Sequence, residues 1–241
     1  MGAGQGLMHR PDGLNGMKVL DSWALWYRFR PRYRAFEHGR IAAFISIPKN
    51  ASKTVLKVLQ LGRNRDEENT DSLVIYENHQ RGAILRAKYR LDDLFVFCFS
   101  RNPYDRCVSW FEYHHHLEPY RSLTFDQWVR NGMPHHWRRQ NQTHYSRRRL
   151  TPLLQYTFVE GCRVDFIGRM EDFARDLRFV VDRLNEISEA RGLEPRFSAA
   201  DYVENTSRRR HDDYSAYYTP ETRNIVFRLL RKDFEHFGYE K

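Results

Sequence analysis

The sequence predicts a three-layer α/β/α domain with a central, mainly parallel sheet. Residues 41–47 (IAAFISI) and 94–100 (LFVFCFS) are near-continuous apolar segments, and residues 164–168 (VDFIG) form a shorter one. Such segments are typical of parallel strands that helices cover on both faces. A helical pattern follows each of them. In a chain of 241 residues, this alternation favours one domain with a substantial core.

We expect this single domain to span residues 41–241. Residues 1–40 are glycine-rich and then aromatic and basic. We expect them to form an N-terminal extension that packs on the domain.

Three helices are expected directly after the three strands. Residues 54–61 place their apolar side chains on one side, and Gly62 stands where a helix commonly ends. Residues 104–116 follow the second strand. Residues 173–184 carry apolar side chains at helical spacing after the third strand.

Two further helices have recognisable first residues. Thr124 with Gln127 three positions later forms a capping-box pattern. Thr219 followed by Pro220 is typical of an N-cap and a first helical position, and this last helix is expected to run as far as Gly238.

Composition limits the class of protein. Lysine and arginine exceed the acidic residues by 40 − 31 = 9, so the surface is expected to attract anions. The three cysteines form no CxxC pair, which indicates a reducing compartment without a disulfide framework. No segment has the continuous apolar stretch of a signal peptide or a membrane span. We expect a soluble, cytoplasmic protein.

The turn after the first strand, PKNASKT, has the composition of an anion site. It joins a buried strand to a helix through small polar and basic residues and contains no acid. A Walker A loop would need two glycines, but Ile47 and Ser52 stand at their positions, which argues against an ordinary P-loop ATPase. A polar loop with incidental lysines is the alternative from this segment alone.

A second basic residue, Arg101, follows the second strand directly in SRNPYDRCVSWF. Ligands of parallel sheets bind at the carboxyl ends of the strands, so we expect Arg101 and the PKNASKT loop to face one site. Two anion sites in one place suggest a nucleotide with phosphates at both ends.

These motifs together resemble the sulfotransferases that use 3'-phosphoadenosine 5'-phosphosulfate (PAPS), in particular their carbohydrate-type branch. The resemblance runs from about residue 41 to residue 239 and includes HHWRRQ, DFIGRMEDFARDL and the C-terminal segment from NTSRRR to HFGY. It implies a P-loop nucleotide-kinase-like fold and transfer of a sulfuryl group from PAPS to a hydroxyl of a saccharide or glycoconjugate. The product nucleotide would be adenosine 3',5'-bisphosphate, and no metal is required.

The resemblance also implies roles for individual residues. Lys49 would contact the oxygen that bridges phosphate and sulfate, and Arg101 and Ser109 would bind the 3'-phosphate. Arg208 and Arg209 lie in a segment that closes over the nucleotide in this family. The loop that holds the 5'-phosphosulfate would comprise Pro48, Lys49, Asn50, Ala51, Ser52, Lys53 and Thr54.

Lys53 departs from the family pattern, which usually has threonine or serine there. Either its side chain adds a second cation, or it points away while Ser52 and Thr54 contact the donor. We favour a backbone contact at Lys53.

A general base is needed for the acceptor hydroxyl, and histidine is the usual choice near neutral pH. His79, between the two nucleotide motifs, resembles the family's catalytic histidine, and Glu77 is the alternative. A surface or capping role for His79 is also open.

Residues 135–150 contain five arginines and no acid. They form either a solvated basic loop or an acceptor site with His136, Trp137 and Gln140.

Consecutive histidines at 114–116 cannot chelate one ion from a helix, so no metal is expected.

Two other classes of function compete with this one. An ATP-dependent kinase of the nucleotide-kinase type would share the sheet but would need magnesium and the missing Walker glycines. A non-catalytic polyanion-binding module would use the net positive charge and show steep salt dependence. We expect as partners PAPS and a neutral or anionic glycan acceptor, and no nucleic acid.

Overall fold

In the computed structural model, four parallel strands form the central sheet in the order β2-β1-β3-β6. The structure describes residues 39–61, 73–118, 120–139, 142–146, 153–199 and 213–241. Almost all of the predicted N-terminal extension therefore lies outside the described residues. The strands are β1 (Ala42–Ile45), β2 (Val74–Tyr76), β3 (Phe95–Ser100) and β6 (Phe166–Arg169).

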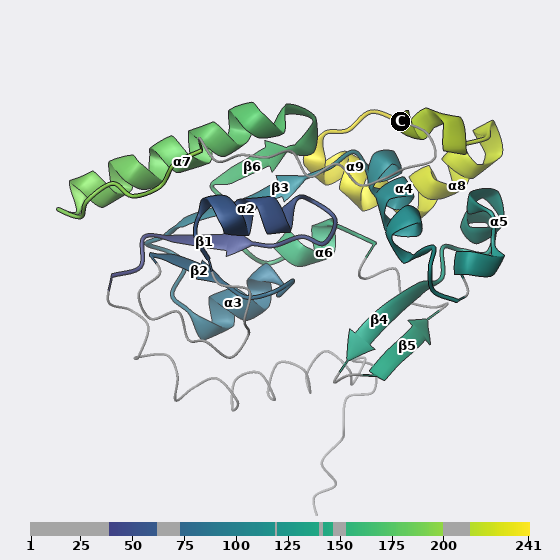
Figure 1. Cartoon of the computed structure of the whole chain (residues 1–241), viewed down its shortest axis with the longest axis horizontal. Helices are drawn as coiled ribbons and strands as arrows, with labels where there is room; N and C mark the ends of the chain where they lie inside the picture. The colour runs from purple at the N-terminus through teal and green to yellow at the C-terminus, as the bar shows by residue number, and fades with distance from the viewer. Residues whose placement is uncertain (1–38, 62–72, 119, 140–141, 147–152, 200–212) are drawn as a thin grey trace, which may run out of the picture.

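Helices cover both faces of this sheet, which confirms the predicted three-layer α/β/α fold (Figure 1). On one face, Phe44, Phe97 and Phe99 pack against α2 (Ser52–Val58) and α7 (Phe173–Ala190). On the other face, the alternate strand residues pack against α3 (Gly82–Lys88), α6 (Tyr156–Val159) and α9 (Arg231–Phe237). Successive strand side chains point to opposite faces, so apolar segments without alternation can serve both layers.

A second group of helices packs beside the carboxyl ends of the strands (Figure 1). It contains α4 (Pro103–His114), α5 (Phe125–Arg130) and α8 (Pro220–Leu229), with the 3-10 turns η2 (Tyr120–Ser122) and η4 (Tyr214–Tyr217). Their shared core is strongly aromatic and centres on the fully buried Trp128. A third 3-10 turn, η3 (Met170–Asp172), precedes α7, and an antiparallel hairpin consists of β4 (His135–Arg139) and β5 (Gln142–Ser146).

The helix starts predicted from capping residues are confirmed. Thr124 and Thr219 each accept a hydrogen bond from the backbone three residues on, and the partner side chain bonds back to the cap. The prediction of one C-terminal helix was wrong, because α8 ends before Leu230 and α9 starts after it; only the stop at Gly238, in the left-handed conformation, is as expected. The strand β2 was not predicted. No helix in the described part of the chain is long and apolar enough to span a membrane.

Candidate active site

The turn between β1 and α2 adopts left-handed backbone conformations without glycine. Lys49 has φ 70° and Ala51 has φ 53°. Positive φ alternates here with ordinary φ at Asn50 and Ser52, a kind of backbone in which successive N–H groups can converge on an anion. Each left-handed non-glycine residue costs about 1–3 kcal/mol and persists only where its surroundings fix it. The turn thus carries its left-handed conformations on two non-glycine residues, neither of them at a Walker glycine position.

Two arginines from the segment after β3 fix this turn through its carbonyl groups. Arg106 donates from Nε to Pro48 O at 3.0 Å and from Nη1 to Leu153 O. Arg101 donates from Nη1 to Lys49 O at 3.2 Å and from Nε to Asp105 Oδ2 at 2.6 Å. The prediction that Arg101 faces the PKNASKT loop is confirmed by this direct contact between Arg101 and Lys49 O.

One face of α4 lies against the loop. Arg106, Ser109 and Tyr113 are spaced three and four residues apart and so share this face. Arg106 bonds to Pro48, and Lys49 Nζ lies 3.8 Å from the centre of the Tyr113 ring. Ser109, between them, is 1% exposed, and among the described residues its hydroxyl has no hydrogen-bond partner. A buried hydroxyl left unbonded beside a cationic loop is consistent with an anion ligand.

The site concentrates positive charge. Burial, and then the charges of Arg101, Lys53 and Arg106, lower the pKa of Lys49 to about 7. Burial lowers the pKa of Arg106 to about 10, against the attraction of Asp233. Repulsion among cations is relieved when an anion enters, so this arrangement favours a ligand with several negative charges.

The predicted loop residues do not all face the same way. The Asn50 side chain is buried and donates to Phe99 O at 2.6 Å and to Gln155 Oε1 at 2.7 Å, so only its backbone is available to a ligand. Thr54 is also buried, whereas the Lys53 side chain is exposed and close enough to Lys49 to lower its pKa.

His79 lies beside the start of the loop, after β2, and has φ 53°. Its Nδ1 lies 3.1 Å from Ser46 O and 3.2 Å from Ser46 Oγ. Ser46 in turn donates to Ser52 Oγ at 2.8 Å. A carbonyl oxygen only accepts, so the contact with Ser46 O favours the tautomer with the proton on Nδ1 and the lone pair of a neutral ring on Nε2.

Glu77 is engaged elsewhere. Its Oε1 accepts from Lys88 Nζ and from the Tyr89 hydroxyl at 2.7 Å. These contacts hold the carboxylate against the end of α3, so of the two predicted bases His79 has the more suitable surroundings.

The remaining predicted residues are only partly covered by the structure. His136 and Trp137 lie on β4, in register with Tyr145 and His144 of β5. Gln140, Arg208 and Arg209 lie outside the described residues.

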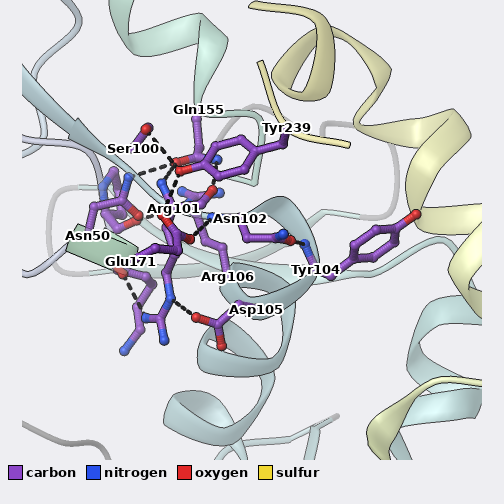
Figure 2. Close-up of polar contacts among 12 residues, drawn as sticks. Asn50, Ser100, Arg101, Asn102, Tyr104, Asp105, Arg106, Gln155, Glu171 and Tyr239 are labelled. Atoms are coloured by element: carbon purple, nitrogen blue, oxygen red, sulfur yellow. Dashed lines mark hydrogen bonds and ion pairs between the residues drawn. The ribbon is translucent and has the colours of Figure 1, made fainter. Parts of the chain in front are cut away.

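Sequence reasoning missed three polar residues near the carboxyl end of β3. Gln155 contacts the loop, Asp233 contacts the backbone of Gln155, and Tyr239 contacts Ser100. All three are far from the loop in the chain, and no local motif singles them out. The Tyr239 hydroxyl bonds to Ser100 Oγ and to Glu171 Oε2, each at 3.0 Å, at the carboxyl end of β3 (Figure 2). Tyr113 could have been found, because it shares a helix face with the predicted Ser109.

A comparison with protein-family models matches residues 37–240 to the sulfotransferase family. The chain belongs to this family. Neither the curated proteins nor the solved structures include a significant match to it. As a sulfotransferase, the protein is a transferase that moves a sulfuryl group, and the matched region contains every element described above.

The site of this sulfotransferase fits an anionic donor. Lys49, Lys53 and Arg101 supply positive charge at the loop, and Ser109 supplies an unbonded buried donor. Arg101 has five N–H groups, of which the contacts with Asp105 and Lys49 use two, so it can donate further.

We predict that Arg106→Met strongly destabilises the fold. The substitution leaves the carbonyl groups of Pro48 and Leu153 without this donor and the buried Asp233 without its nearby cation. Removing one partner from such a buried arrangement typically costs about 3–5 kcal/mol. The free energy of unfolding is measured by urea denaturation.

The matched control is Arg130→Met. Arg130 pairs with Asp126 at 2.8 Å on the exposed surface of α5, and exposed helix pairs contribute little. Equal denaturation midpoints for the two variants would contradict a structural role for Arg106.

Proposed function

We propose that the protein transfers the sulfuryl group of PAPS to a hydroxyl of a saccharide or glycoconjugate. One observation carries the proposal: the lysine-containing loop after β1 and the arginine after β3 are in direct contact, through Arg101 Nη1 and Lys49 O. One small ligand with an anionic group at each end can therefore reach both. PAPS is such a ligand, and the resemblance to carbohydrate-type sulfotransferases points to it and to a glycan acceptor.

In this proposal, the loop and Lys49 hold the 5'-phosphosulfate, and Arg101 with Ser109 binds the 3'-phosphate. A bond forms between the acceptor oxygen and sulfur while the bond from sulfur to the bridging oxygen breaks. Lys49 stabilises the charge that develops on the bridging oxygen. His79 Nε2 takes the proton of the acceptor hydroxyl, and its position depends on Ser46.

Binding of adenosine 3',5'-bisphosphate tests the donor. We expect it to raise the melting temperature more than ATP with magnesium or an oligonucleotide does. A ligand at about a hundredfold excess over its Kd stabilises the fold by about 2.7 kcal/mol. Stabilisation by ATP with magnesium alone would support a kinase, and stabilisation by the oligonucleotide alone would support a polyanion-binding module. Either result overturns the proposal.

A second prediction concerns the base. His79→Asn, which tolerates the left-handed backbone at this position, should lower turnover by about 10²- to 10⁴-fold. Turnover is measured as transfer of labelled sulfate from PAPS to the best acceptor in a glycan panel. Stabilisation by the bisphosphate should be unchanged, because His79 is placed on the acceptor side.

The control for this substitution is His236→Asn, at an exposed position on α9. It should leave turnover unchanged. Full turnover in His79→Asn would show that His79 is not the base.

A third prediction follows from the lowered pKa of Lys49. An anion binds better to the charged lysine, so above pH 7 binding requires the uptake of a proton. The Kd for adenosine 3',5'-bisphosphate should rise with pH between 7 and 9, by up to about tenfold per unit. Phosphate groups, with a second pKa of about 6, are already ionised in this range.

In Lys49→Arg the cation stays charged throughout this range, so the dependence on pH should disappear. Isothermal titration at several pH values measures both proteins. The same slope in both would assign the titration to another group.

A further inference from the structure

Gln155 connects the two halves of the candidate site. Its side chain, 0% exposed, lies just before α6. Oε1 accepts from Asn50 Nδ2 at 2.7 Å and from the Arg101 backbone N–H at 3.0 Å, and Nε2 donates to Arg101 O at 2.8 Å (Figure 2). One uncharged amide thus bonds to the loop after β1 and to the first residue after β3.

Gln155 is itself anchored from the C-terminal helix. Its backbone N–H donates to Asp233 Oδ2 at 2.9 Å, and the N–H of Tyr156 donates to Asp233 Oδ1 at 2.8 Å. Asp233 lies on α9 and is fully buried. Because the carboxylate accepts hydrogen bonds from two successive backbone N–H groups, the start of α6 is held in a fixed position against α9.

The sheet alone does not fix the spacing of the two halves. The pairing of β1 with β3 ends at Ile45 and Cys98, whereas Lys49 and Arg101 lie beyond it. Past that point, the two segments are joined by side-chain contacts. Arg101, which also faces the anion site, and Arg106 make contacts through charged groups, and the Asn50 amide donates to Phe99 O at 2.6 Å. Gln155 is a neutral contact, buried away from solvent, that bridges both segments at once.

We propose that Gln155 is a positioning residue that sets the distance between the two phosphate-binding halves. It would thereby determine the selectivity for a nucleotide phosphorylated at both the 3' and 5' positions over one with a single phosphate. The proposal rests on the proposed function, in which the loop and Arg101 hold the two ends of one nucleotide. A second phosphate adds affinity only where both sites can be engaged together, and such sites work only when held within about 0.5 Å.

The test compares two nucleotides on one variant. Gln155→Met keeps the approximate volume and removes all three side-chain hydrogen bonds. The Kd values for adenosine 3',5'-bisphosphate and for adenosine 5'-monophosphate are measured by isothermal titration. We expect the preference for the bisphosphate to fall about tenfold or more, with less than about a threefold change for the monophosphate, because only the bisphosphate needs the spacing.

A matched control is Asn185→Leu. Asn185, on α7, also bridges two segments with its amide, donating to Phe197 O at 3.0 Å and accepting from Phe197 N at 3.1 Å. It lies outside the site, so its loss should leave the nucleotide preference unchanged.

The possible outcomes separate the two proposals. A wild-type protein without preference for the bisphosphate would overturn the proposed function. Two results would overturn the role of Gln155 but leave the proposed function standing. One is a preference for the bisphosphate that survives in Gln155→Met, and the other is an equal loss of affinity for both nucleotides. If Gln155→Met is too unstable to measure, the same ratio is read from Gln155→Asn, whose amide is one methylene shorter.

Discussion

Repulsion among cations around one short turn is the constraint on which the site depends. Lys49, Arg101 and Arg106 lie close together; Arg106 is fully buried and the other two are partly buried, so water screens their repulsion less than at the surface. Each arginine therefore donates a hydrogen bond to a carbonyl of the loop. Each also has an acidic neighbour: Asp105 bonds to Arg101, and Asp233 attracts Arg106. Lys49 lies over the Tyr113 ring and has no such acid beside it among the described residues; burial, and then the neighbouring cations, lower its pKa to about 7. The protein thus compensates the structural cations and leaves the loop lysine to be compensated by a ligand.

The same contacts explain how a turn without glycine keeps its left-handed backbone. Left-handed backbone at Lys49 and Ala51 is unfavourable by itself, and the arginine bonds to Pro48 O and Lys49 O keep the turn in this conformation. Glycine at these positions would avoid the backbone strain. In this protein, hydrogen bonds from another segment offset it instead. The conformation of the loop therefore depends on α4. This helix supplies Arg106, which bonds to Pro48 O, and places Ser109 and Tyr113 on the same face as Arg106.

Much of the fold, and part of the site, could be predicted from the sequence because the signals are local. Apolar segments gave the strands β1, β3 and β6, and Thr124 and Thr219 marked helix starts through contacts three residues apart. The three-residue strand β2 was too short to recognise. The break at Leu230 was missed because no glycine or proline marks it; α9 there carries Asp233, which must reach the backbone of Gln155, 78 residues away. Contacts of such separation leave no pattern in a single sequence, and these are the contacts that join the two halves of the site.

The order of strands in the sheet also arranges the chemistry of the site. The carboxyl ends of β2, β1 and β3 lie side by side in this order, and they carry His79, the Lys49 loop and Arg101 respectively. Under the proposed function, the base and the 3'-phosphate site thus lie on opposite sides of the loop that holds the sulfuryl group. An acceptor hydroxyl must then approach from the β2 side, since the β3 side is occupied by the nucleotide. His79 is linked to the loop through Ser46 and Ser52. Under the proposed function, one strained turn therefore positions both the base and the donor, which suits an in-line displacement that depends on positioning.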